Sequence, residues 1–220
     1  MPLVIAMDGP SGSGKSSASK GVARALGLRY LDTGAMYRAM TWWMLNNGVP
    51  VEDGGAVAAR APEPAIASGT DPDAPAITVD GRDVSGPIRT REVTNAVSAV
   101  SSVPAVRARL VELQREIIGA GGIVVEGRDI GTVVAPDAPV KVYLTASEET
   151  RARRRAKDLA ADPGASVTVT QAEQARRDRL DSTRKASPLT RAGDAHEIDS
   201  TELSLAEVIE AIVRLAKEHE

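Results

Sequence analysis

The segment Gly9-Pro10-Ser11-Gly12-Ser13-Gly14-Lys15-Ser16 constrains this chain most, because it matches the pattern G-x-x-x-x-G-K-[ST]. An apolar run precedes it and a helical pattern follows it, as the mechanism of that motif requires. Its glycines let successive backbone amides point at one anion, and the following helix adds the positive end of its dipole. We therefore predict a phosphate-binding loop in which Lys15 reaches the β- and γ-phosphates and the Ser16 hydroxyl completes a Mg²⁺ shell. The alternative is an ordinary glycine-rich turn with a surface lysine.

Short apolar runs alternate with helical periodicity along most of the chain. Such runs, bounded by turn signals, are typical of strands buried in a parallel sheet whose crossover connections are helices. They predict five strands, near residues 3–7, 28–31, 123–125, 140–144 and 196–198. The predicted fold class is α/β, with a five-stranded parallel sheet and flanking helices.

Local signals predict where the helices begin and end. Gly27 suits the left-handed position after a helix, and Thr33 is expected to cap the next one. Pro104 divides the helical stretch over residues 93–118, because proline cannot continue a helix ladder. A capping-box pattern occurs at Thr170 and again at Ser204, and we expect these two residues to start the last two helices.

One stretch interrupts the alternation. Residues 52–75 are rich in Ala, Gly, Pro and Asp, and beyond them two β-type triplets, at 77–79 and 82–84, flank Asp80-Gly81. That pattern predicts a β-hairpin in the middle of an α/β sequence. Because 220 residues suit one core with an insertion, we predict a single domain over residues 1–220 with an inserted subdomain over about 52–93.

Composition excludes several classes of protein. Lys and Arg total 27 against 30 for Asp and Glu, and aromatic residues make up 2%, so neither a basic track nor stacking platforms for nucleic acid are expected. The chain has no Cys, and no apolar run is long enough to span a bilayer. We therefore predict a cytoplasmic protein with no nucleic-acid or membrane partner. The segment Thr145-Ala146-Ser147 stands where a GTP-dependent switch would carry [NT]-K-x-D, which favours a small kinase instead.

Two polar clusters follow predicted strands. Asp32 to Arg38 comes after the second strand and Glu126 to Thr132 after the third, so both are expected at the carboxyl edge of the sheet, beside the loop. Arg38 and Arg128 can there face the same crevice as Lys15. The alternatives are a solvated helix arginine for Arg38 and an Arg-Asp surface pair for Arg128.

A third group consists of arginines. Arg151, Arg154 and Arg155 lie within reach of one helical face, and Arg177 and Arg184 belong to the next helical region. Two helices separated by Asp162-Pro163-Gly164 are predicted to form a lid over about residues 147–186. A solvated basic face is the alternative, and it is the interpretation that we keep for Arg153 and Arg179.

Taken together, these segments resemble bacterial cytidylate kinases. The segments concerned are Gly9 to Ser16, Asp32 to Arg38, Asp83-Val84-Ser85, Asn95-Ala96-Val97-Ser98, Glu126 to Thr132 and Arg184-Lys185-Ala186-Ser187-Pro188-Leu189. The resemblance covers almost the whole chain and is thin over residues 52–75. It implies a P-loop NTPase-like fold with a helical lid and an insert that closes over CMP. It also implies transfer of the γ-phosphoryl group of ATP to CMP or dCMP, with Mg²⁺ as cofactor.

The resemblance further implies a donor site at the loop and an acceptor site at the sheet edge. The implied ATP-binding residues are Gly9, Pro10, Ser11, Gly12, Ser13, Gly14, Lys15, Ser16 and Ser17. The implied CMP-binding residues are Thr33, Tyr37, Arg38, Ser98, Arg107, Arg128, Asp129, Arg177, Asp181 and Arg184. The implied catalytic residues are Lys15, Arg128, Arg154 and Arg184, and the implied lid residues are Arg151 and Arg154. Within the acceptor set, the resemblance assigns the base to Ser98, Arg107 and Asp129, and the ribose to Asp181.

The residue types suit this chemistry. The second pKa of a phosphate monoester is about 6, so the acceptor oxygen is already an anion at neutral pH and needs no general base. What the site must supply is positive charge, together with exclusion of water. A kinase for another nucleotide or a hydroxylated metabolite, and a nucleotide-binding regulatory module without turnover, remain alternatives. We expect a monomer.

Overall fold

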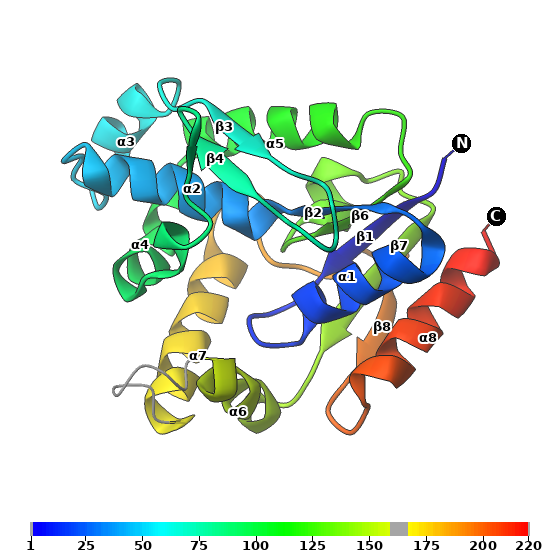
Figure 1. Cartoon of the computed structure of the whole chain (residues 1–220). Helices are drawn as coiled ribbons and strands as arrows, with labels where there is room; N and C mark the ends of the chain where they lie inside the picture. Colours follow the sequence, from blue (N-terminus) through cyan, green and yellow to red (C-terminus); the bar gives the residue numbers. More distant parts are fainter. Residues whose placement is uncertain (1, 159–166, 220) are drawn as a thin grey trace.

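Five parallel strands form the central sheet of the computed structural model, which describes residues 2–158 and 167–219 (Figure 1). They are β1 (Val4–Asp8), β2 (Arg29–Asp32), β6 (Ile123–Glu126), β7 (Val140–Thr145) and β8 (His196–Asp199). Their order in the sheet is β2-β6-β1-β7-β8, and every neighbouring pair is parallel. This confirms the predicted fold class and all five predicted strands.

Helices cover both faces of the sheet. On one face lie α1 (Lys15–Leu26) and α8 (Leu205–Lys217), and on the other lie α2 (Thr33–Asn46), α4 (Arg91–Ser101) and α5 (Pro104–Ile118) (Figure 1). Successive side chains of β1 point to opposite faces, so Ile5 and Met7 join the core with α1 and α8, whereas Ala6 joins the other core. Two aliphatic cores therefore hold the strands, and the carboxyl ends of the strands are left free for polar loops.

Three of the predicted helix boundaries are confirmed. Gly27 adopts a left-handed conformation at the end of α1, with φ of 64°. Pro104 is the first residue of α5. Ser204 and Glu207 form the predicted reciprocal capping box, in which Glu207 Oε2 accepts from the Ser204 amide at 2.8 Å.

Two predicted caps are wrong. The cap of α2 is Asp32, whose carboxylate accepts from the Ala35 amide at 2.9 Å, while the Thr33 hydroxyl donates to the Glu126 carbonyl at 2.7 Å. Thr33 is drawn away because β2 and β6 are neighbours, which brings that carbonyl within its reach. Thr170 lies inside α7 (Val167–Thr183) rather than at its start, and its side chain is buried.

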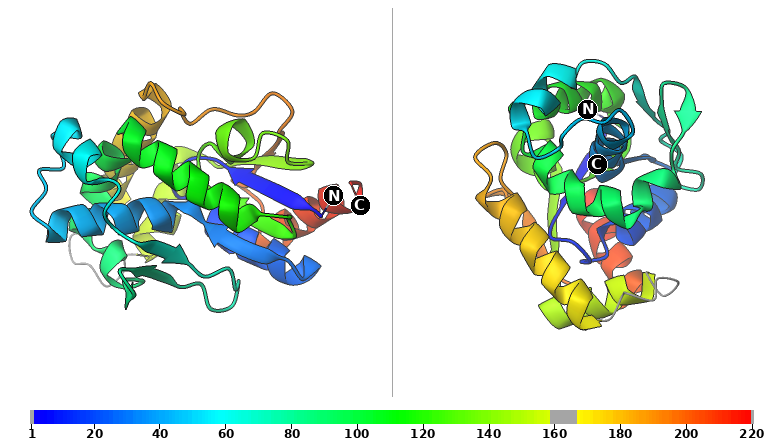
Figure 2. Two further views of the ribbon diagram at one scale, coloured as in Figure 1. Left: turned by 90° about the horizontal axis from the view of Figure 1, so that it is seen from above. Right: turned by 90° about the vertical axis from the view of Figure 1, so that its left-hand side faces the viewer.

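The insertion forms a small sheet beside α2 (Figure 2). Between α2 and α4 the chain forms α3 (Gly54–Arg60), β3 (Ile66–Ser68), β4 (Ile77–Val79), β5 (Arg82–Asp83) and the 3₁₀ turn η1 (Pro87–Arg89). The antiparallel pairing of β4 with β5 confirms the predicted hairpin around Asp80-Gly81, whereas β3 lies in the stretch for which no strand was predicted. One loop of the insertion also reaches the main sheet, where Thr70 O accepts from the Tyr30 amide at 2.9 Å.

The remaining elements lie near the carboxyl edge of the sheet. The π-helical turn η2 (Ile130–Val134) follows β6, and α6 (Glu148–Asp158) packs against α7. The predicted Asp162-Pro163-Gly164 turn between these two helices lies outside the described residues. In the part of the chain that the structure describes, no helix is both long enough and apolar enough to cross a bilayer.

Candidate active site

The predicted phosphate loop joins β1 to α1. Gly9, Gly12 and Gly14 have φ of 146°, 78° and 91°, which side-chain-bearing residues rarely adopt. A β-carbon on Gly9 would in addition overlap the carbonyl oxygen of Leu144 on β7. Glycine is thus required by both backbone conformation and close packing.

Lys15 is buried under this loop. Its Nζ donates to the Pro10 carbonyl at 2.7 Å, so the ammonium group bends back into the concavity of the loop. Burial, together with the nearby guanidinium of Arg128, lowers the pKa of Lys15 to about 7. An amine held in this way gains stabilisation when an anion enters the loop.

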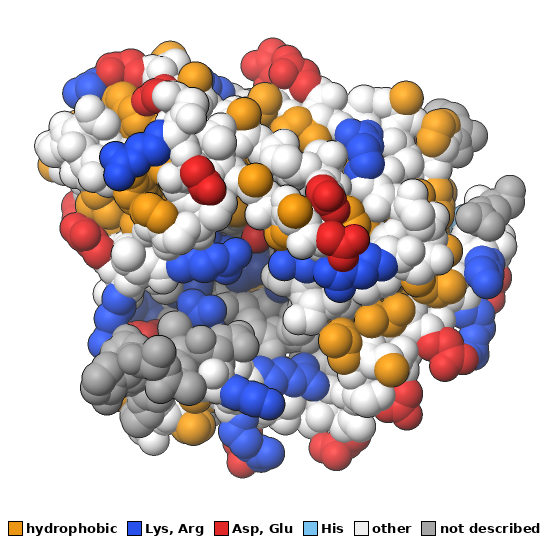
Figure 3. Space-filling model, viewed as in Figure 1, with side chains coloured by type: hydrophobic (Ala, Val, Ile, Leu, Met, Phe, Trp, Pro, Cys, Tyr) orange, Lys and Arg blue, Asp and Glu red, His pale blue; other side chains and the backbone are white. Residues whose placement is uncertain are grey.

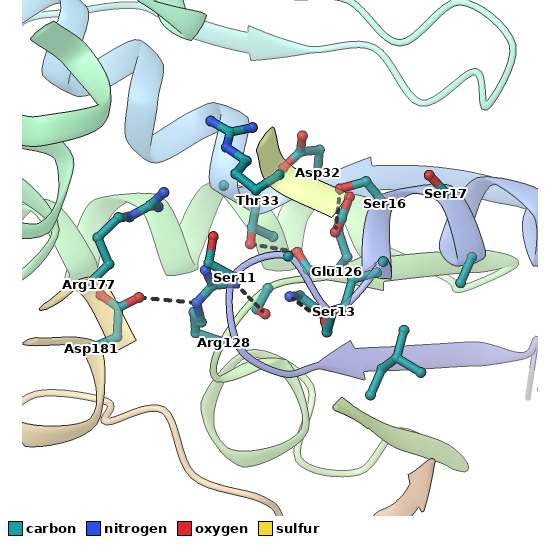
Figure 4. A pocket seen from close by; sticks show the side chains of 18 of the residues that line it. Ser11, Ser13, Ser16, Ser17, Asp32, Thr33, Glu126, Arg128, Arg177 and Asp181 are labelled. Atoms are coloured by element: carbon teal, nitrogen blue, oxygen red, sulfur yellow. Dashed lines mark hydrogen bonds and ion pairs between the residues drawn. The ribbon is translucent and has the colours of Figure 1, made fainter. Parts of the chain in front are cut away.

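Oxygen ligands gather on the other side of the loop (Figure 4). Ser16 Oγ donates to Glu126 Oε2 at 3.0 Å, and the Tyr30 hydroxyl donates to the other carboxylate oxygen of Glu126. Burial, with the Asp32 carboxylate nearby, raises the pKa of Glu126. A hydroxyl beside two carboxylates is a donor set that suits a small divalent cation, which would relieve the repulsion between them. The residues present thus fit Mg²⁺.

Asp8, at the end of β1, connects the loop to the turn after β6. Its carboxylate accepts from the amides of Ile130 and Gly131, each at 2.8 Å. Burial raises the pKa of Asp8 to about 6, although these two amides oppose the rise. Sequence reasoning did not assign Asp8 a role; the available signal was an acidic residue at the end of an apolar strand, directly before the loop.

A buried ion pair lies at the far end of the site. Arg107 donates to Asp129, and the two side chains are 4% and 5% exposed. Arg184 Nη2 lies 3.7 Å from the other oxygen of Asp129. The hydroxyl oxygens of Tyr37 and Ser98 are buried and have no hydrogen-bond partner among the described residues. Polar groups in this state are available to a ligand.

Cations crowd the space between this pair and the loop. Arg128 Nε donates to Asp181 Oδ2 at 3.1 Å, which brings the turn after β6 into contact with α7 (Figure 4). Burial, followed by repulsion from Arg128 and Arg38, lowers the pKa of Arg177 to about 10. Lys and Arg side chains gather around a hollow above α6 and α7 (Figure 3). An excess of buried positive charge of this kind favours polyanionic ligands.

One cavity of about 630 Å³ contains both regions. The predicted residues that line it are Ser11, Gly12, Ser13, Gly14, Lys15, Ser16, Ser17, Thr33, Tyr37, Arg38, Ser98, Arg107, Arg128, Asp129, Arg154, Arg177, Asp181 and Arg184. Four further cations, Lys20, Arg89, Arg155 and Lys157, also line it without having been assigned to the site from sequence. The structure therefore brings the donor and acceptor sets together at one edge of the sheet.

The two predicted lid arginines differ in position. Arg154 lines the cavity and contacts Ser200, with Nη1 2.9 Å from its hydroxyl and Nη2 2.7 Å from its carbonyl. Arg151 lies behind the loop instead, where Nη1 donates to the Ser11 carbonyl at 2.9 Å. Gly9 and Pro10 also lie outside the cavity lining. Arg153 is exposed and pairs with Glu149, as the alternative for that residue predicted.

A phosphate loop on a parallel sheet, opening into a cavity with a second cationic region, defines the class of P-loop kinases. The chain belongs to the cytidylate kinase family, whose model matches residues 5–218. It is 61% identical over 218 residues to the cytidylate kinase of Streptomyces coelicolor and 58% identical over 218 residues to that of Streptomyces avermitilis. Each match covers 98% of this chain and 93% of the relative. A solved structure of an uncharacterized protein from Eubacterium ventriosum ATCC 27560 is similar in fold, with TM-score 0.55, 11% identity and 99% of both chains covered.

Proposed function

We propose that this protein transfers the γ-phosphoryl group of ATP to CMP or dCMP, yielding ADP and CDP or dCDP. The observation that carries the proposal is the single cavity, in which the phosphate loop faces a buried Arg107–Asp129 pair across a set of arginines. The cavity thus offers space for two nucleotides whose phosphates meet among cations. Membership of the cytidylate kinase family supports the same conclusion.

In this proposal the loop binds the triphosphate. The amides around Gly12 and Gly14 and the ammonium group of Lys15 face its β- and γ-phosphates. Ser16, with Glu126 and Asp32 behind it, would hold Mg²⁺, which when bound neutralises phosphate charge. Lys15 then leaves its contact with the Pro10 carbonyl and gains charged partners.

The acceptor nucleotide occupies the other half of the cavity. Arg38, Arg128 and Arg184 are proposed to hold its phosphate, and Asp181 its ribose. The Asp129 carboxylate accepts from the N4 amino group of cytosine, while Arg107 donates to N3. Because the acceptor phosphate is already ionised, the arginines orient it and stabilise the charge that develops during transfer, and no side chain has to remove a proton.

Two mobile parts are proposed to complete the site. The insertion over about residues 52–93 closes over the acceptor nucleotide, and residues 147–186 act as a lid that brings Arg154 and Arg151 toward the phosphates. Closure excludes water and so protects ATP from hydrolysis. A monomeric state, a cytoplasmic location and the absence of a nucleic-acid partner remain predictions from the sequence.

A panel of acceptors tests the proposed function. The purified protein is incubated with ATP, Mg²⁺ and one of CMP, dCMP, UMP, AMP, GMP or shikimate, and ADP formation is followed. We expect rapid turnover only with CMP and dCMP. Faster turnover with another acceptor would identify a different kinase, and ATP binding with no ADP formed would identify a regulatory module.

A further inference from the structure

The helix α7 touches the tip of the phosphate loop through a closed set of contacts. The Ser11 amide donates to Asp178 Oδ1 at 3.1 Å, and the Ser11 carbonyl accepts from Arg151 Nη1 at 2.9 Å. Arg151 and Asp178 also form an ion pair with side chains 9% and 17% exposed. Both backbone groups of one loop residue are therefore held by a pair that joins α6 to α7.

Close packing strengthens this connection. Gln174, one turn before Asp178 on α7, has its Nε2 3.4 Å from the Ser11 carbonyl and 3.4 Å from the Arg151 carbonyl. A β-carbon on Gly12 would overlap the Gln174 side chain. The tip of the loop consequently cannot move without either moving α7 or breaking these contacts.

The same helix contacts the acceptor half of the cavity. Asp181 follows Asp178 by three residues, so both lie on one side of α7, and Asp181 accepts from Arg128 at 3.1 Å. Arg177 lines the cavity beside them. One rigid element therefore touches the donor loop with Asp178 and the acceptor region with its neighbours.

We propose that Asp178 is a positioning residue that couples the two halves of the active site, so that CMP bound in the acceptor half tightens the binding of the donor triphosphate. This inference rests on the function proposed above. CMP fixes α7 through Arg177 and Asp181, and α7 fixes Ser11 through Asp178. The triphosphate then meets a loop whose ordering has already been achieved, so its binding costs less.

The coupling is measured as a ratio of dissociation constants. Isothermal titration calorimetry gives Kd for the Mg²⁺ complex of the non-hydrolysable ATP analogue AMP-PNP, first without CMP and then with saturating CMP. Coupling between sites is typically about 5- to 150-fold, so we expect the wild-type Kd to fall at least about fivefold. Linkage requires CMP affinity to rise by the same factor when AMP-PNP is present.

The test variant is Asp178→Asn, and the matched control is Glu173→Gln. The amide retains the shape of Asp178 and an acceptor for the Ser11 amide, but it loses the ion pair with Arg151. Glu173 lies on the same helix and its side chain pairs with Arg91 on α4, so its replacement also removes one carboxylate from an ion pair. We expect the ratio to fall below about twofold in D178N and to keep its wild-type value in E173Q.

A second variant separates positioning from folding. Arg151→Gln removes the other member of the pair and should lower the ratio as D178N does, and the double variant should lower it no further, because both changes break one connection. A wild-type ratio near one, or an unchanged ratio in D178N, would overturn the coupling role of Asp178. Failure of the wild-type protein to bind or phosphorylate CMP would instead overturn the proposed function.

Discussion

Replacing Asp129 by Asn is expected to change which base the acceptor site accepts. Asn keeps the size of the side chain and one carbonyl oxygen for Arg107, but it places an amide donor where the carboxylate had an acceptor. Cytosine presents an N4 donor at this position and uracil presents an O4 acceptor. The change therefore removes one favourable contact with CMP and creates one with UMP.

The magnitude follows from the burial of the pair. Arg107 and Asp129 are only 4% and 5% exposed, so a mismatched polar group there is not rescued by solvent. An unsatisfied buried polar group costs about 1–3 kcal/mol, and the two effects, on CMP and on UMP, add in the ratio. We expect the preference for CMP over UMP to fall about 10²-fold, which corresponds to about 2.7 kcal/mol.

The assay is kcat/KM for CMP and for UMP, measured in wild type, D129N and the control Asp137→Asn. Asp137 is exposed and does not line the cavity, so its replacement removes the same charge without touching the base. Any general loss of stability in D129N affects both substrates and cancels in the ratio; thermal unfolding measures it separately. A ratio within about twofold of wild type in D129N would refute the base-reading role of Asp129.

Three further predictions concern the donor half of the site. Lys15→Ala should lower kcat by about 10²–10³-fold with the fold intact, because the lost contact strengthens as charge develops; steady-state kinetics showing a near-normal kcat would contradict the loop assignment. Arg154→Ala should slow transfer and raise the fraction of ATP lost to water, whereas Arg153→Ala, which removes an exposed pair with Glu149, should change neither; equal effects on ADP and CDP yields would contradict the difference in position. The pKa of Lys15 is lowered to about 7 in the free protein, and bound phosphates favour the charged amine, so binding takes up a proton above pH 7. The calorimetric Kd for ATP should therefore rise between pH 7 and 9, by up to about tenfold per pH unit, and a Kd independent of pH would contradict the shift.

Sequence alone was sufficient wherever the deciding interactions are local. The strand, loop and helix around Gly9 to Ser16 depend on residues that are neighbours in the chain, and the structure has all three. The hairpin at Asp80-Gly81 and the capping box at Ser204 are confirmed for the same reason, since each is closed by residues within a few positions. The strand β3 was missed because three residues of weak pattern become a strand only by pairing with β4.

Tertiary structure decided which distant groups meet. Thr33 was predicted as a cap, yet the neighbouring strand β6 offers its hydroxyl a carbonyl, and Asp32 caps the helix instead. Arg151 shares a helical face with Arg154 in the sequence pattern, but Asp178, 27 positions further along, holds it behind the loop.

The pairing of Arg107 with Asp129, like the contact of Asp8 with the turn after β6, depends on where α5 and β6 pack against the sheet. The sequence therefore determined the local elements and the residue types that bind phosphate. Only packing of those elements decided their partners, because a contact between residues far apart in the chain exists only once the helices and strands between them are in place.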